Sequence, residues 1–236
     1  MNSYKFDYYQ YKQRINPKSK LSISLCLVVI ILLIGATCFL RQNSNKIEFH
    51  FVEVGTFFNY KDANSQAIEL QQKNAGGYIY FDGSYHVLAC AYINKEDATN
   101  VAKNLSNQYP SAKQLTISTK EFNSKGFTKK ETQTIKKVIS ANDKVINDLY
   151  ATMVDFETNV INDNQFNIKI QHLSNHYAQE TKDFLSMFKV NSTISTLKEK
   201  ISTIQSCLDE SLEGYKLKYN LIKIVITHYS FLEFFC

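Results

Sequence analysis

The feature that most limits the fold of this chain is an internal repeat between residues 50–70 and 85–105. With an offset of 35 residues, as from Val52 to Val87, the two segments carry identical or similar residues at Val52/Val87, Phe57/Tyr92, Asn59/Asn94, Asp62/Asp97, Ala63/Ala98, Ala67/Ala102 and Leu70/Leu105. Each copy reads as a strand followed by a helix. Because one strand and one helix cannot bury their apolar faces alone, the repeat predicts that the two copies pack together.

The sequence around the two copies completes a βαββαβ order. The expected elements are a strand from Phe49, a helix from Tyr60 to before Gly76, a hairpin over 77–92, a helix from Asn94 to Pro110 and a strand over 112–118. Asn59 and Asn94 suit helix N-caps, and Asp82-Gly83 suits a hairpin turn. We therefore expect an α+β fold, with a four-stranded antiparallel sheet, two helices on one face and a free opposite face.

Residues 120–236 show helical periodicity. Apolar residues recur every three or four positions in three runs, with breaks near residues 162–164 and 190–192, where Asn and Ser suit turns and caps. Short breaks favour an α-helical hairpin or three-helix bundle that buries these stripes within the chain. Self-association or a partner helix would bury them equally well. The strongly apolar end, residues 224–236, is expected to pack on the bundle, to touch the membrane or to form a contact site.

Residues 21–40 contain no charged side chain, and a helix of that length spans the hydrocarbon core of a bilayer, about 30 Å thick. A cleaved signal peptide is the alternative, but the long preceding segment favours an uncleaved single transmembrane helix. Residues 1–20 carry five Lys or Arg residues, which places this tail in the cytoplasm. Residues 41–48 are then a short linker, and the regions over 49–119 and 120–236 lie outside the cell membrane.

The net charge of +5 does not indicate a nucleic-acid partner. Residues 1–20 contribute +4 of it, so no long basic stripe remains to neutralise phosphates. The five cysteines show neither a CxxC motif nor zinc spacing. His172, His176 and Glu180 share one helix face, but a polar surface is the simpler interpretation of this spacing. No catalytic arrangement can be assembled, so we expect no enzymatic activity, no metal and no cofactor.

The repeat resembles the SPOR (sporulation-related repeat) domain family over residues 48–119. The segments "FVEVGTFFNYKDANSQAIELQQ" and "YHVLACAYINKEDATNVAKNL" are similar to the two halves of that domain. Glu53 stands where the family usually has Gln, and Cys90-Ala91 replaces Gly-Pro. A membrane span followed by such a domain is also similar to the arrangement in stage II sporulation protein B-like proteins.

The resemblance implies binding to peptidoglycan glycan strands stripped of their stem peptides. Strand alternation predicts that six side chains look out from the free sheet face: Phe51, Glu53, Thr56, Ser84, His86 and Leu88. Glu53, Thr56 and Ser84 match family positions implicated in glycan contact. The alternative interpretation is that these six residues merely coat a solvated or helix-covered sheet.

We therefore expect a membrane-anchored protein that binds peptidoglycan at the division or sporulation septum of a bacterium. Its helical region would recruit other septal or sporulation envelope proteins. The alternative is an envelope scaffold that binds no glycan and uses its sheet domain and helices for protein–protein interaction or self-association. An enzyme with an unrecognised site is a third hypothesis.

Overall fold

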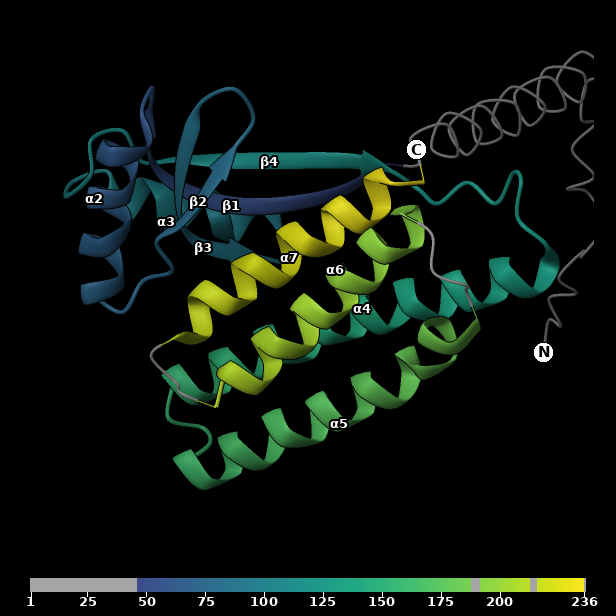
Figure 1. Cartoon of the computed structure of the whole chain (residues 1–236). Coiled ribbons are helices and arrows are strands. Elements are labelled where there is room, and N and C mark those ends of the chain that lie inside the picture. The colour runs from purple at the N-terminus through teal and green to yellow at the C-terminus, as the bar shows by residue number, and fades with distance from the viewer. Residues whose placement is uncertain (1–45, 188–191, 213–215, 236) are drawn as a thin grey trace, which may run out of the picture. The chain divides into compact units, whose positions relative to one another are not determined.

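The computed structural model describes residues 46–187, 192–212 and 216–235, so the predicted basic tail and membrane span lie outside the described residues. In chain order the elements are β1 (Lys46–Phe57), α2 (Tyr60–Gln72), β2 (Tyr78–Phe81), β3 (Tyr85–Tyr92), α3 (Lys95–Leu105), β4 (Lys113–Lys120), α4 (Lys129–Glu157), α5 (Asp163–Met187), α6 (Ser192–Glu210) and α7 (Leu217–Glu233). Figure 1 shows their arrangement.

The four strands form one curled antiparallel sheet in the order β2-β3-β1-β4. The predicted βαββαβ order and the two predicted caps are confirmed. Asn59 and Asn94 accept hydrogen bonds from the backbone N–H groups of Asp62 and Asp97, at 3.0 and 2.8 Å, and so satisfy two N–H groups that have no partner within the helix.

One sheet face packs against α2 and α3. Val52 and Val54 of β1 meet the alanine stripes of these helices in a small core that also holds Ala63, Ala67, Ala98 and Ala102. Alanine at these helix positions lets the helices lie close to the sheet. The two copies of the repeat thus bury their apolar faces against one another, as the sequence predicts.

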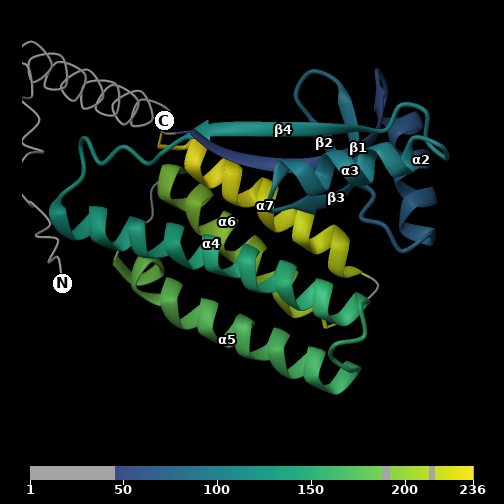
Figure 2. The ribbon, with the colours of Figure 1, turned by 180° about the vertical axis from the view of Figure 1, so that it is seen from behind.

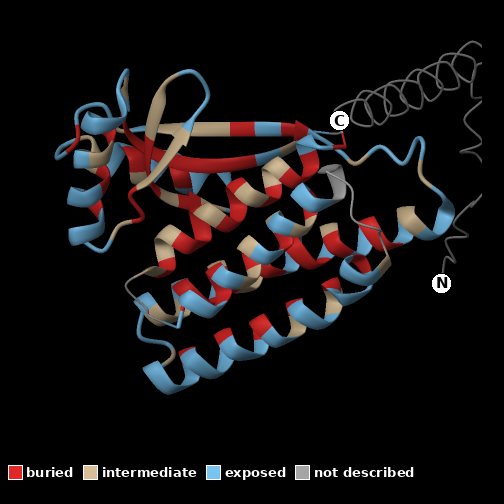
Figure 3. Ribbon diagram, in the orientation of Figure 1, coloured by how far each residue is buried: buried red, intermediate tan, exposed pale blue. Residues whose placement is uncertain are grey.

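The opposite sheet face is not free, and this corrects the expected fold. α7 runs along it and contacts β2, β3 and β4 on one side and α4 and α6 on the other (Figures 1 and 2). Ten of its 17 residues are buried. A helix placed between two layers is apolar on nearly all sides, which explains the strongly apolar C-terminal sequence. Figure 3 shows that buried residues make up much of both α7 and β1.

The described part of residues 120–236 forms four helices, so the predicted hairpin or three-helix bundle is wrong. The third predicted run is two helices, α6 and α7, and the segment between them contains Gly214, a poor helix former. α4, α5, α6 and α7 share one core with the sheet residues Phe49 and Phe51. The apolar stripes are buried within the chain.

No helix among residues 46–187, 192–212 and 216–235 is long and apolar enough to cross a membrane. The expected fold class is a sheet with one free face, preceded by a transmembrane helix and followed by an α-helical hairpin or three-helix bundle. In the described residues it is corrected to a sheet covered by helices on both faces.

Candidate functional site

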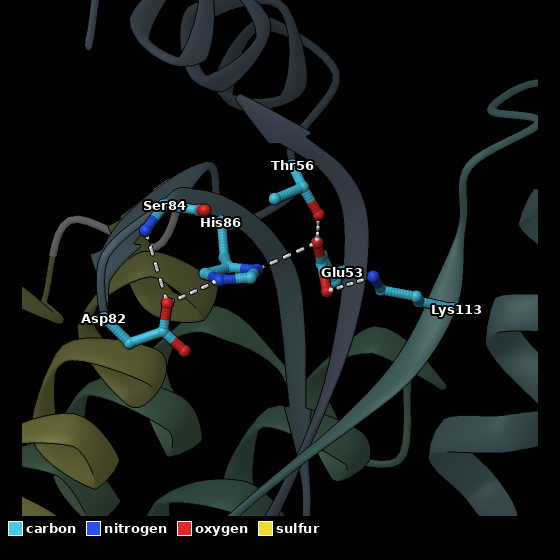
Figure 4. A network of polar contacts seen from close by, with 6 residues as sticks. All are labelled: Glu53, Thr56, Asp82, Ser84, His86 and Lys113. Atoms are coloured by element: carbon cyan, nitrogen blue, oxygen red, sulfur yellow. Dashed lines mark hydrogen bonds and ion pairs between the residues drawn. The ribbon is translucent and has the colours of Figure 1, made fainter. Parts of the chain in front are cut away.

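A polar cluster lies on the same sheet face as α7, beyond the part of that face that the helix covers. Its members, which we call the Glu53–His86 cluster, are Glu53, Thr56, Asp82, Ser84, His86 and Lys113 (Figure 4). His86 lies two residues before Leu88 on β3 and so shares its sheet face. Thr56, Asp82 and Lys113 are exposed, so the cluster reaches solvent.

An irregular stretch of β1 positions the first two members. The register between β1 and β3 shifts on both sides of Glu53, so that Glu53 pairs with Leu88 and Thr56 pairs with His86. Bulges of this kind bend a strand and redirect its side chains. Here the Thr56 hydroxyl donates to Glu53 Oε1, three residues earlier in the chain.

Glu53 is fully buried, and its carboxylate has two different environments. Oε1 lies 3.0 Å from His86 Nδ1, in addition to its bond from Thr56. Oε2 has no hydrogen-bond partner in the described part of the chain and lies 3.5 Å from Lys113 Nζ, within ion-pair distance. A buried carboxylate is stable only when it is paired, so these neighbours hold Glu53 in place.

His86 bridges two carboxylates. Its Nε2 lies 2.9 Å from Asp82 Oδ1, which also accepts a bond from the backbone N–H of Ser84 at 3.4 Å. Only the protonated ring can donate from both nitrogens at once. The distances therefore favour the imidazolium form.

The electrostatics agree with this protonation state. Burial alone would lower the pKa of His86, but the hydrogen bonds from the ring to Glu53 and Asp82, together with their negative charges, outweigh it and raise the pKa. The bond from His86 is also the main reason why the pKa of Asp82 is lowered. His86 and Asp82 thus each favour the charged form of the other.

The structure brings together four of the six predicted site residues: Glu53, Thr56, Ser84 and His86. Phe51 and Leu88 lie on the same sheet face but are fully buried in the core that the sheet shares with the helices. The expectation of a side chain that looks out from a free face is wrong for Glu53, which is fully buried. For Phe51 and Leu88 it is wrong because α7 covers that part of the sheet. They cannot contact a ligand while the helix is in place.

Sequence reasoning missed two members of the cluster. Asp82 was interpreted only as part of the hairpin turn, although the turn also places its carboxylate beside His86. Lys113 pairs with Glu53 across β1 and β4. Aligning the two strands would have placed this ammonium opposite the carboxylate, but the register depends on tertiary structure.

The cluster offers several hydrogen-bonding groups. Among the described contacts, the Thr56 hydroxyl bonds to Glu53, and neither it nor the Ser84 hydroxyl bonds to the imidazole of His86. Within the described ranges, no group of three metal-ligating side chains occurs. Glu180, one of the three residues considered for a metal, lies 3.6 Å from Lys137 Nζ.

Comparison with known proteins gives no relative for this chain: no family model, no curated protein and no solved structure matches it. The SPOR resemblance therefore stays a prediction that rests on the two segments quoted above.

Proposed function

We propose that this chain is a non-enzymatic, membrane-anchored envelope protein that binds peptidoglycan glycan strands through the Glu53–His86 cluster. The observation that carries the proposal is the convergence of four of the six residues predicted from sequence into one polar cluster that is open to solvent. Because Phe51 and Leu88 are buried, the proposed contact surface is limited to the part of the sheet face that carries the Glu53–His86 cluster.

The chemistry of the cluster suits a glycan. With His86 protonated, the two carboxylates of Glu53 and Asp82 balance the charges of His86 and Lys113. The cluster then presents donors and acceptors without net charge, which fits the hydroxyl and acetamido groups of a sugar chain. The ring of Tyr80, with its centroid 6.1 Å from that of His86, adds an aromatic surface beside these groups.

The envelope location in this proposal rests on the uncharged segment 21–40 and the basic tail before it. We place the tail in the cytoplasm and the cluster outside the membrane, with enrichment at the division or sporulation septum. Glycan binding is favoured over self-association through the helices, because the apolar stripes that self-association would need are buried within the chain.

The test is cosedimentation of the purified full-length chain with bacterial sacculi, before and after amidase treatment removes the stem peptides. We expect enrichment over an inert protein, and stronger enrichment on treated sacculi. Lys113→Gln should weaken binding about tenfold, the effect of losing one charged hydrogen bond. Lys103→Gln, an exposed control on α3, should bind like the wild type.

Absence of enrichment on either form of sacculus would refute glycan binding. Equal binding by the Lys113→Gln and Lys103→Gln variants would show that the binding surface lies outside the cluster. Circular dichroism of each variant checks that the fold is intact.

A further inference from the structure

A second surface, at the β2 edge of the sheet, has the features of a ligand groove. It has a volume of about 370 Å³ and lies between α2 and β2, with Tyr85 of β3 and Tyr219 of α7 at its borders. Small-molecule sites are of this size. None of the residues that line the groove belongs to the Glu53–His86 cluster, so the two surfaces are distinct.

Three aromatic rings form one continuous wall of the groove. The ring of Tyr85 lies between those of Phe81 and Tyr60, with centroid distances of 4.7 and 5.9 Å. Phe81 is 58% exposed and Tyr60 is 56% exposed, although an aromatic ring is more stable when it is removed from water. A contiguous exposed aromatic surface of this kind is typical of a binding site.

The groove is also built to hold its polar groups in place. Gly77 has a positive φ of 60°, and a Cβ there would lie 2.3 Å from the carbonyl oxygen of Ala67, so only glycine lets β2 start this close to α2. Across this contact, Gln71 Nε2 donates to Gly77 O at 3.1 Å. The bond fixes the amide of Gln71, whose oxygen accepts no hydrogen bond from the described residues and is left to accept one from a ligand.

The groove carries no formal charge. Among the described residues that line it there is no Asp, Glu, Lys, Arg or His. Its polar groups are the amides of Asn64 and Gln71 and the hydroxyls of its tyrosines. A phosphate or an acidic peptide would find no cation here, and a purely apolar ligand would leave the amides without partners.

We infer that this groove binds an uncharged saccharide. The C–H face of a sugar ring stacks on an aromatic side chain, and its hydroxyl groups donate to and accept from the amides of Asn64 and Gln71. A proline-rich segment also favours aromatic grooves, but proline has no N–H to donate to the Gln71 oxygen. The inference goes beyond the proposed function and does not depend on the Glu53–His86 cluster.

A tryptophan reporter tests the inference, because the chain contains no tryptophan of its own. Tyr60→Trp places a single indole in the aromatic wall. Phe58→Trp is the matched control, since Phe58 is 97% exposed and does not line the groove. Both full-length variants are titrated with chitotetraose, cellotetraose and a hexaproline peptide, and their indole emission is recorded.

We expect a saturable emission change in the Tyr60→Trp variant with at least one of the two oligosaccharides, and none in the Phe58→Trp variant. Adding Phe81→Ala or Asn64→Ala to the Tyr60→Trp variant should weaken the apparent affinity about tenfold, as the loss of one stacking or hydrogen-bonding partner predicts. Adding Lys113→Gln should leave the response unchanged, so a failure of the proposed function does not affect this result.

The absence of a saturable response to both oligosaccharides at millimolar concentration would overturn the inference. A response to hexaproline alone would also overturn it and would assign the groove to a peptide. Equal responses of the Tyr60→Trp and Phe58→Trp variants would show that the change does not arise in the groove.

Discussion

The carboxylate of Glu53 and the imidazole of His86 lie 3.0 Å apart, on two neighbouring strands and 33 positions apart in the chain. Glu53 is fully buried, and the side chain of His86 is 12% exposed. This pair joins the two halves of the repeat through a polar contact, on the sheet face that also carries the buried apolar residues Phe51 and Leu88.

The charge of His86 should make stability depend on pH. Its folded-state pKa is raised above the ordinary value of 6.5, so the stabilisation from Glu53 and Asp82 is fully present below that value and is lost as pH rises through the folded-state pKa. Urea unfolding measures this effect. The free energy of unfolding of the wild type should decline as pH rises through this range, and the His86→Gln variant should lack this decline. If the free energy of unfolding depended on pH in the same way in both proteins, the pairing of His86 with Glu53 and Asp82 would be contradicted.

Phe51 should behave as a core residue. Phe51→Ala should lower the free energy of unfolding by about 3–5 kcal/mol, because it removes a fully buried ring. Phe58→Ala, at a 97% exposed position directly after β1, should change it by less than about 0.5 kcal/mol. Chemical denaturation measures both. Similar small effects would mean that α7 does not cover the sheet.

The two asparagine caps should contribute equally. Asn59→Ala and Asn94→Ala should each cost about 0.5–2 kcal/mol, because each leaves a helix N–H group without its acceptor. Asn104→Ala, at an exposed position inside α3, should be neutral or slightly stabilising. A cap variant as stable as the Asn104→Ala variant would contradict the assigned capping role.

A buried polar chain fixes α7 to the other helices. Asn142 of α4 accepts from the Tyr177 hydroxyl at 2.9 Å and lies 3.1 Å from His228 Nδ1, and His228 Nε2 lies 2.9 Å from Asp143. Asn142→Ala should destabilise the protein by about 1–3 kcal/mol, since it leaves buried groups without partners. In the Asn142→Ala variant, the rate of backbone amide hydrogen exchange should then rise first in α7. An unchanged exchange rate in α7 would show that these hydrogen bonds do not hold the helix.

The sheet and the helices of the repeat could be predicted because their signals are local. Alternating apolar residues, capping asparagines and the Asp82-Gly83 turn each specify a short piece of backbone. The covering of the sheet by α7 could not be derived from periodicity, because a helix with apolar residues on nearly all sides does not indicate which layer it faces. Its apolar sequence indicated burial, and packing was one of three interpretations.

The candidate site shows the same limit. Alternation correctly placed Glu53 and His86 on one face, but the exposure of Phe51 and Leu88 depended on what lies over that face. Lys113 joins the cluster only through the register of β4, which is set by tertiary contacts.

The most direct test of the proposed glycan site uses the five histidines of the chain as internal probes. The full-length protein is labelled with ¹⁵N at histidine, and imidazole resonances are followed as glycan fragments released from amidase-treated sacculi are added. The account predicts a saturable shift of the His86 resonances, with those of His172 and His176 on α5 unchanged. A saturable shift at His172 or His176 with none at His86, or no shift at any histidine, would contradict it.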